Sequence, residues 1–302
     1  MAVAHAGTAA RPVETAKSAR RRSTAAPVLR FLSRAPVHGF LVLVGLFWLV
    51  PTFGLFLTSL LPASVVNEGG WWQILAEPGL ATLNNYREVF ATEAIMESLV
   101  TTLVVTIGAT ILPIFVAAMA GYAFAWLDFP GRDWLFIGVI AMLVVPLQMA
   151  LIPIFSVYNR FGLFDTVLGL VLFHTAFGLP FAVFLLRNFF LGIPRELLEA
   201  ARIDGASELR IFFRLVLPLG LPAIASLGIF QFLWTWNDLL VSLTFGRDTQ
   251  TITVAIFGQL RQFGSNIELI APASFLSLVV PLIVFFAFQR YFVQGLLAGS
   301  VK

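Results

Sequence analysis

The chain has 302 residues, of which 59% are hydrophobic and only 12% are charged. Soluble globular domains average about 25% charged residues, and the mean hydropathy of +0.92 lies far on the apolar side. The sequence is therefore that of a polytopic membrane protein. It contains no cysteine, which excludes a disulfide framework, a thiolate metal site and a cysteine nucleophile.

The formal net charge is +3, and much of the positive charge lies in residues 1–34. This segment is rich in Ala, Arg, Ser and Thr, and no periodic apolar face runs through it. We expect a disordered basic cytoplasmic tail over residues 1–37 and a transmembrane domain over residues 38–302. On a membrane protein such a tail is more simply an orientation signal than a nucleic-acid-binding arm, so we expect no nucleic-acid partner.

The apolar residues predict six transmembrane helices, at about 20 residues per span. The predicted spans are Phe40–Leu61, Ser98–Phe124, Trp134–Tyr158, Thr166–Phe189, Leu219–Leu243 and Pro272–Phe292. The first is longer than the apolar core of a signal peptide, which has about 7 to 15 residues, and no A-x-A cleavage pattern follows it. We therefore predict an all-α polytopic fold in which the first span is retained.

The distribution of positive charge orients these spans. Six spans place both termini on one side of the membrane, and cytoplasmic loops carry an excess of Lys and Arg. With the N-terminus inside, every Lys and Arg except Arg87, Arg160, Arg247 and Arg261 lies in a cytoplasmic segment. We therefore expect both termini to be cytoplasmic, in the multi-pass arrangement of a protein of the bacterial cytoplasmic membrane.

A charged stretch separates the fourth and fifth spans: residues 199–222 read EAARIDGASELRIFFRLVLPLGLP. An arginine at the centre of a membrane helix costs about 2.5 to 3.5 kcal/mol, so this stretch does not enter the bilayer. Pro194 suits a first helical position. Arg195 with Glu199, and Glu199 with Arg202, have the spacing of ion pairs on one helix face. The apolar residues Leu197, Leu198 and Ala201 line another face.

The end of this short helix is also marked. Gly205 suits a left-handed stop, and Ser207 can cap a following helix that has Glu208 in its first turn. About ten helical residues reach about 15 Å, which is too short to span a bilayer. The stretch is thus a compact amphipathic helix on the cytoplasmic face, and from its chemistry alone an interfacial helix resting on lipid headgroups is an equal alternative.

The order of these residues resembles the "EAA…D-G-A-S…F…LP" loop of ABC importer permease subunits. Five more segments resemble the carbohydrate-uptake branch of that family, in the same order along nearly the whole chain after the tail. They are ATLNNYREVF (81–90), GYAFAWLDFPGRDWLF (121–136), VPLQMALIPIFSVYNRFGLFDTVLGLVL (145–172), WTWNDLLVSL (234–243) and FQRYFVQGLLAGSVK (288–302). The MalG-like second permease of maltose- and trehalose-type importers is the nearest pattern. The segment Pro62–Leu80 matches no pattern, and the tail is longer than is usual in the family.

The resemblance implies a division of labour between subunits. No G-x-x-x-x-G-K-[ST] loop for phosphates is present, since Lys17 and Lys302 are the only lysines. This chain is thus not expected to be an enzyme or to hold a cofactor; ATP and Mg would be bound by a partner ATPase, present in two copies. The other implied partners are a second, MalF-like permease, an extracytoplasmic sugar-binding protein and the lipid bilayer. The residues implied to couple to the ATPase are Glu199, Ala200, Ala201, Asp204, Gly205 and Ala206.

Polar and aromatic residues within spans are candidates for the substrate pathway, since buried polar groups in membranes usually face a bundle interior or a water-filled cavity. The fifth span carries a group that offers both ring faces and hydrogen-bonding groups, as a sugar requires: Gln231, Trp234, Trp236, Asn237 and Asp238. Tryptophan at the end of a span is also a common interface anchor. Gln148 and His174 are further candidates, although both have an ordinary structural explanation in helix contacts. His5, His38 and His174 show no ligand spacing, so no metal site is expected.

Two other functions are compatible with a polytopic membrane protein of this composition. A secondary transporter or channel subunit would require paired carboxylates or a histidine relay within the spans, for which Asp238 and His174 are the candidates. An ABC importer of phosphate esters, peptides or polyamines would require several charged residues in the pathway. The sequence favours a permease subunit that forms half of the pore of an ATP-driven importer of a di- or oligosaccharide such as trehalose or maltose.

Overall fold

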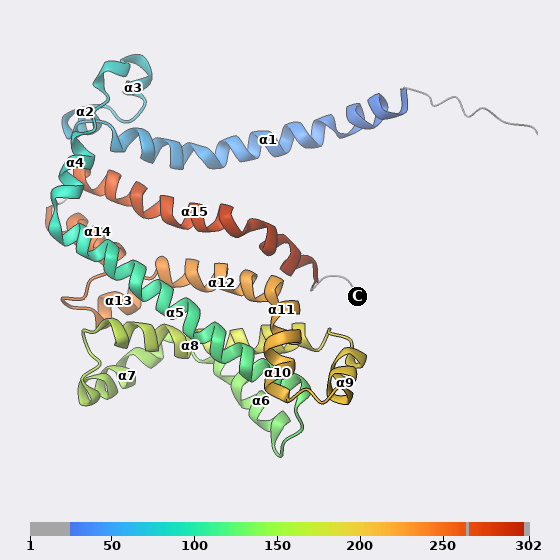
Figure 1. The fold of residues 1–302 in the computed structure, drawn as a ribbon. Coiled ribbons are helices and arrows are strands. Elements are labelled where there is room, and N and C mark those ends of the chain that lie inside the picture. Colours follow the sequence, from blue (N-terminus) through green and yellow to red (C-terminus); the bar gives the residue numbers. More distant parts are fainter. Residues whose placement is uncertain (1–24, 264–265, 299–302) are drawn as a thin grey trace, which may run out of the picture. The chain divides into compact units, whose positions relative to one another are not determined.

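The computed structural model describes residues 25–263 and 266–298, and every regular element in these ranges is helical. Figure 1 shows the helices in chain order. The predicted all-α fold is confirmed. Residues 1–24 of the predicted tail lie outside the described part, whereas Ala25 already begins the first helix, α1 (Ala25–Ser59). The alanines and leucines that follow Ala25 are good helix formers and extend the first span toward the N-terminus.

Among the residues that the structure describes, four continuous helices are long and apolar enough to cross a membrane. They are Pro36–Ser59 within α1, α5 (Glu93–Trp126), α8 (Val167–Phe190) and Ile267–Arg290 within α15 (Ile267–Ala298). They correspond to the first, second, fourth and sixth predicted spans. Helices α5 and α15 begin five residues before the predicted boundaries Ser98 and Pro272, because each helix continues past the apolar run that marks the span.

The third predicted span is broken. It consists of α6 (Arg132–Ala141) with a 3₁₀ turn at Met142–Val144, and of α7 (Leu147–Phe161), and the two halves meet at 103°. Proline disfavours helical backbone angles in the residue before it. Val145 before Pro146 accordingly has φ −71° and ψ 116°, and Pro146 itself has ψ 130°. The predicted third span Trp134–Tyr158 is therefore present as a bent pair of helices and not as one continuous helix.

The fifth predicted span, Leu219–Leu243, begins at a bend. A helical stretch that lies almost wholly before it runs through α10 (Glu208–Ile211), a π-helical turn at Phe212–Val216 and α11 (Leu217–Leu219). It meets α12 (Leu221–Trp236) at 72°. The bend lies at Gly220, where a Cβ atom would approach Phe190 to 2.6 Å. At its other end α12 stops at Trp236, and α13 (Leu240–Phe245) follows as a separate helix.

The centre of the fold is the parallel packing of α5 on α8. Gly108 lies against Val171, and Gly121 lies against the backbone of Leu186 and Arg187, with the nearest atoms only 3.0 Å from where a Cβ would stand. Small residues allow two membrane helices to approach in this way. Because α5 and α8 run in the same direction, the bent α6–α7 pair must carry the chain back between them, so it acts as one crossing despite its bend.

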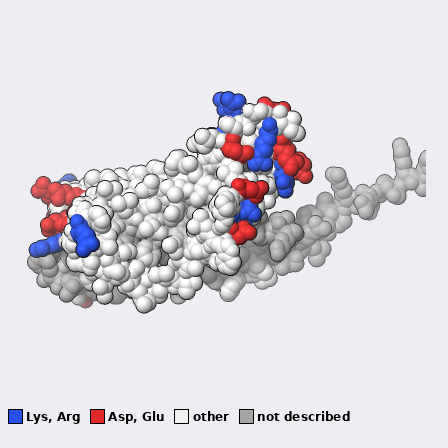
Figure 2. Space-filling model, turned by 90° about the horizontal axis from the view of Figure 1, so that it is seen from below, with Lys and Arg blue, Asp and Glu red and all other residues white. Residues whose placement is uncertain are grey.

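Figure 2 shows a wide uncharged band with charged side chains gathered at its two ends. At one end, Trp126 Nε1 donates to the carbonyl of Phe190 at 3.0 Å, which brings the ends of α5 and α8 together. The helix α9 (Arg195–Ile203) follows at this end. Such a band is the form expected of a chain that crosses a bilayer, and we name the end that carries α9 the α9 end.

The opposite end is built from short helices. The segment Pro62–Leu80, which resembles no family pattern, contains α2 (Ala63–Glu68), α3 (Gln73–Ala76) and a 3₁₀ turn at Pro78–Leu80. The helices α4 (Asn84–Ala91) and α14 (Ile252–Phe263) complete this end. Asn85 on α4 is buried, and its amide donates to the carbonyls of Ser59 and Leu61 at 3.0 and 2.8 Å. These bonds satisfy carbonyls that the end of α1 leaves unpaired.

At the same end, Asp165 connects the loop before α8 with the loop after α13 through hydrogen bonds. It has a positive φ of 57°, its amide donates to the Phe245 carbonyl, and its Oδ1 accepts the backbone N–H groups of Asp248 and Thr249, each at 2.9 Å. Burial acts to raise the pKa of Asp165, but the hydrogen bonds from Thr249 and Asp248 outweigh it and lower the pKa below its ordinary value. The charged form of Asp165 therefore stabilises the fold.

We predict that Asp165→Asn lowers the thermal midpoint of the detergent-purified protein at pH 7 by about 2–6 °C, as expected for about 1–2 kcal/mol from a charge-assisted hydrogen bond. A carboxyl whose folded pKa is lowered contributes stability above its unfolded pKa, and this is lost as the pH falls through the folded pKa. The difference between variant and wild type should therefore shrink below about pH 4.

The matched control for this prediction is Asp248→Asn. Asp248 contributes only its backbone N–H to the contact with Asp165, and its side chain is exposed. A thermal shift for Asp248→Asn as large as that for Asp165→Asn, or a difference for Asp165→Asn that persists unchanged at low pH, would contradict the role of the Asp165 charge.

Candidate functional site

The amphipathic helix predicted after the fourth span is present as α9 (Arg195–Ile203). Pro194 has ψ 131° and precedes the helix, so it is one position earlier than predicted. Gly205 has φ +77°, which confirms the left-handed stop. Ser207 has extended backbone angles and precedes α10, but its hydroxyl makes no capping hydrogen bond.

One side of α9 is packed and the other is open. Leu198 is fully buried in a core cluster with Phe190, Ile211 and Phe212. The opposite face exposes its side chains: Glu196, Glu199, Ala200 and Ile203. Ile203 is 86% exposed. We call these four residues the α9 face. Of the predicted coupling residues, Asp204 and Gly205 are also exposed beside it, whereas Ala201 and Ala206 are half-buried against the core.

Of the two ion pairs predicted on α9, the pair of Arg195 with Glu199 forms and the pair of Glu199 with Arg202 does not. Arg195 Nε lies 2.9 Å from Glu199 Oε1, as expected for the i, i+4 spacing. Arg202 does not pair with Glu199; its Nε lies 2.8 Å from Glu208 Oε1, across the turn at Gly205. The hydrogen bond that Arg202 donates to Glu208 raises the pKa of Arg202. Arg202 therefore points into the fold, while Glu199 stays on the exposed side.

Glu208 joins α9 to the end of α5. Tyr122 Oη donates to Glu208 Oε2, and Tyr122 is only 4% exposed. Arg202 Nη2 also donates to the carbonyl of Trp126 at 3.4 Å. We call Tyr122, Arg202 and Glu208 the α9 latch, because they fix the helix to α5 and α10. Sequence reasoning missed it, since Tyr122 and Glu208 are far apart in the chain and share no periodicity.

The pathway candidates on α12 divide between two faces. Gln231 is buried, and its Nε2 donates to the carbonyls of Ala109 at 3.1 Å and His174 at 3.4 Å. Trp236 is 1% exposed, and its Nε1 donates to the Ser277 carbonyl on α15 at 2.9 Å. Both side chains therefore hold α12 to its neighbours.

The other face of α12 is open. Trp234 is 66% exposed, and Asn237 is exposed as well. Asn237 Nδ2 donates within its own helix, to the Leu233 carbonyl at 2.8 Å. Phe230, Trp234 and Asn237 follow one another at helical spacing along this face, which we call the α12 face. Gln148 is exposed too, but it lies separately in the first turn of α7.

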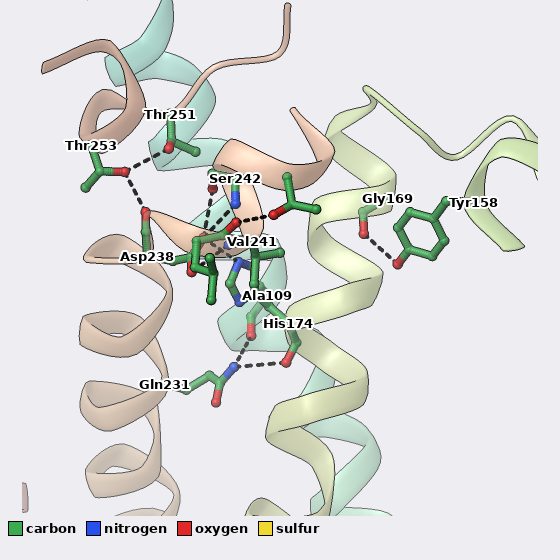
Figure 3. Close-up of polar contacts among 12 residues, drawn as sticks. Ala109, Tyr158, Gly169, His174, Gln231, Asp238, Val241, Ser242, Thr251 and Thr253 are labelled. Atoms are coloured by element: carbon green, nitrogen blue, oxygen red, sulfur yellow. Dashed lines mark hydrogen bonds and ion pairs between the residues drawn. The ribbon is translucent and has the colours of Figure 1, made fainter. Parts of the chain in front are cut away.

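Asp238 and His174 meet inside the fold. Asp238 Oδ2 lies 3.7 Å from His174 Nε2, and both side chains are almost fully buried. The carboxylate also accepts hydrogen bonds from the first turn of α13, as Figure 3 shows. No group of three His, Cys, Asp or Glu side chains in residues 25–263 and 266–298 has the arrangement of a metal site.

The chain resembles known proteins over most of its length. A family model described as "Binding-protein-dependent transport system inner membrane component" matches residues 23–297. The osmoprotective compounds uptake permease protein GgtD of Synechocystis sp. is 45% identical over 278 residues, which cover 90% of this chain and 93% of GgtD. The alpha-glucoside transport system permease protein AglG of Rhizobium meliloti is 51% identical over 233 residues, which cover 74% of this chain and 61% of AglG.

A solved structure shares the fold. The crystal structure of a bacterial ABC transporter involved in the import of the acidic polysaccharide alginate contains a chain that matches with a TM-score of 0.70 and 21% identity. The match covers 86% of this chain and 97% of that chain. The helix arrangement is thus one that occurs in solved membrane proteins.

The α9 latch generates a prediction about stability. Glu208→Gln removes the charge that Tyr122 and Arg202 share, so we expect the thermal midpoint of the purified protein to fall by about 2–4 °C, which corresponds to about 1 kcal/mol. Glu199→Gln is the matched control, because its pair with Arg195 is exposed and such pairs contribute about 0–1 kcal/mol. Equal shifts for the two variants would contradict the latch.

Proposed function

Because the chain belongs to the family of binding-protein-dependent transport system inner membrane components, we propose that it is the permease subunit of an ATP-driven sugar importer and forms half of its translocation pore. One observation carries the proposal: α9 presents an exposed face at one end of the helix bundle while its opposite side is locked into the core. A helix that merely rested on lipid headgroups would need a broad apolar face toward the lipid. The α9 face has one large apolar side chain, Ile203, beside the two carboxylates of Glu196 and Glu199.

The partner of the α9 face in this proposal is an ATPase subunit. ATP binding draws two ATPase subunits together, and α9 passes their movement to the spans through Leu198 and the latch residues Arg202 and Glu208. Glu199 makes the charged contact with the ATPase, and Gly205 shapes the turn beside it. ATP and Mg belong to the ATPase, and the permease supplies the path. Both termini then lie in the cytoplasm, on the α9 side.

The proposed cargo is a di- or oligosaccharide, with α-glucosides such as trehalose or maltose as the leading candidates. The relative named an alpha-glucoside permease, with 51% identity, supports this class. The α12 face offers an exposed indole ring at Trp234 and a carboxamide at Asn237, on which the C–H face and the hydroxyls of a sugar can rest. A second, MalF-like permease covers this face in the assembled pore, and an extracytoplasmic binding protein delivers the sugar at the end opposite α9.

The direct test of the proposal is purification of the tagged chain from its native membrane in mild detergent, with the bound proteins identified by mass spectrometry. We expect an ATPase, a second permease and an extracytoplasmic binding protein, and the binding protein can then be screened against α-glucosides. Recovery of the chain alone, or only with further copies of itself, in several detergents would contradict the proposal and would favour ion-driven transport.

We predict that Glu199→Lys lowers ATP-dependent sugar uptake at least about tenfold. The new ammonium group would stand beside the guanidinium of Arg195, so two positive charges would replace the carboxylate that contacts the ATPase. Loss of about 1.4 kcal/mol of binding free energy lowers an affinity tenfold. Asp133→Lys makes the same change of charge at the start of α6, outside the α9 face, and should leave uptake near the wild-type level. Undiminished uptake by Glu199→Lys would count against the role of Glu199.

A further inference from the structure

A buried polar cluster lies between α8 and the far end of α12, away from α9. It consists of His174 on α8, Gln231 on α12 and Asp238 just after α12, and we call it the outer cluster. Figure 3 shows the side chain of Gln231 directed at the backbone carbonyls of Ala109 and His174, with Asp238 near the His174 ring. His174 Nε2 is buried and has no hydrogen-bond partner, and it stands 3.7 Å from Asp238 Oδ2. Buried polar atoms are nearly always paired, so this unpaired nitrogen calls for an explanation.

Asp238 determines the course of the chain where α12 ends. Its Oδ1 accepts the backbone N–H of Val241 at 3.2 Å, and its Oδ2 accepts the backbone N–H and hydroxyl of Ser242 at 2.9 and 3.0 Å. Its own carbonyl accepts the hydroxyl of Thr253 on α14. The carboxylate therefore holds the turn that directly follows Asn237 on the α12 face.

Helix α12 contacts His174 at two levels. The amide of Gln231 reaches the backbone carbonyl of His174, and it occupies space that only a glycine leaves open, since a Cβ on Gly178 would stand 2.6 Å from Gln231 Oε1. Two turns farther along α12, Asp238 faces the imidazole of the same histidine. Residue 174 is thus the point on α8 to which the outer half of α12 is attached.

The contact between His174 and Asp238 is incomplete in this structure. A separation of 3.7 Å exceeds the range of a hydrogen bond, and a shift of α12 against α8 by less than about 1 Å would bring the two atoms to about 2.9 Å. The hydroxyls of Thr106 and Thr110 on α5 and of Thr235 on α12 are also buried without a hydrogen-bond partner.

We propose that His174 is a positioning residue of the transport cycle, which transmits displacement of α8 to the α12 face through Asp238 and Gln231. Helix α8 leads into α9 at one end and carries His174 near the other, so one continuous helix joins the two places. Movement of α9 closes or opens the contact between His174 and Asp238, and the turn after Asn237 moves with it. The proposal rests on the function proposed above, and it adds the residues that connect α9 with the pathway.

The test uses the complete complex in proteoliposomes, with sugar uptake and ATP hydrolysis measured in the same preparation. His174→Leu fills similar space without a polar atom, and His174→Asn is the milder variant should leucine impair assembly. We expect each to keep the ATPase bound and hydrolysing ATP while sugar moved per ATP falls by at least about fivefold, the lower end of typical coupling between sites. Asp238→Asn should show the same loss, and His174→Asn combined with Asp238→Asn should be no worse than either alone.

Thr175→Val is the matched control, because Thr175 neighbours His174 and bonds only to the Val171 carbonyl of its own helix. It should leave the ratio of sugar to ATP unchanged. Wild-type ratios in both His174 variants, or strictly additive losses in the double variant, would overturn the proposal, since a side chain that only fills space predicts either result. A wild-type chain that retains no ATPase would instead refute the proposed function and leave the outer cluster as a structural contact.

Discussion

The parallel contact between α5 and α8 is the interaction on which the other parts of the fold depend. Between membrane helices, close packing of small residues and interhelical hydrogen bonds replace the hydrophobic driving force of soluble proteins. Gly108 and Gly121 bring the two helices together, and Ala109 between them offers its carbonyl to Gln231 of α12. The same pair carries Tyr122 and Leu186 into the core beneath α9. A bulkier residue at Gly121 would meet the backbone atoms of Leu186 and Arg187 on α8. It would therefore disturb both the packing of α5 on α8 and the core beneath α9.

Helices α8 and α5 connect the α9 end with the opposite end of the helix bundle. Helix α8 passes from His174 to Phe190 and continues through Pro194 into α9, while α5 holds α9 from the side through Tyr122. At the α9 end the latch residues are paired with one another; at the opposite end His174 Nε2 has no hydrogen-bond partner and lies 3.7 Å from Asp238 Oδ2. The two attachments of α8 therefore differ: the one near α9 is made by close hydrogen bonds, and the one near His174 is not.

Much of this architecture could be predicted from the sequence, and the rest could not for physical reasons. Apolar length identified the four continuous crossings, and glycine chemistry identified the turn at Gly205. Proline did not reveal the breaks, because Pro113 and Pro180 lie inside the long helices α5 and α8, whereas Pro146 follows a sharp bend. Neighbouring helices can satisfy the carbonyl that a proline frees, and only the tertiary structure shows where they do.

The candidate site shows the same limits. The pair of Arg195 and Glu199 follows from helical spacing and was predictable, whereas Arg202 turns to Glu208 because the chain reverses between them. On α12, Gln231 and Trp234 are three positions apart, a spacing that places both residues on one side of a helix, so periodicity alone could not separate the buried Gln231 from the exposed Trp234. The meeting of His174 and Asp238 could not be foreseen, because it depends on how two distant helices pack.

The central claim is that the α9 face docks on an ATPase subunit, and the absence of cysteine from the chain permits a direct measurement. Ile203→Cys places a single thiol at a highly exposed point of that face, where a short photoactivated cross-linker can be attached in native membranes. The account predicts a covalent product with the ATPase, and none from Ile152→Cys, an exposed apolar position on α7. Efficient labelling of Ile203→Cys without any cross-link to an ATPase would contradict it.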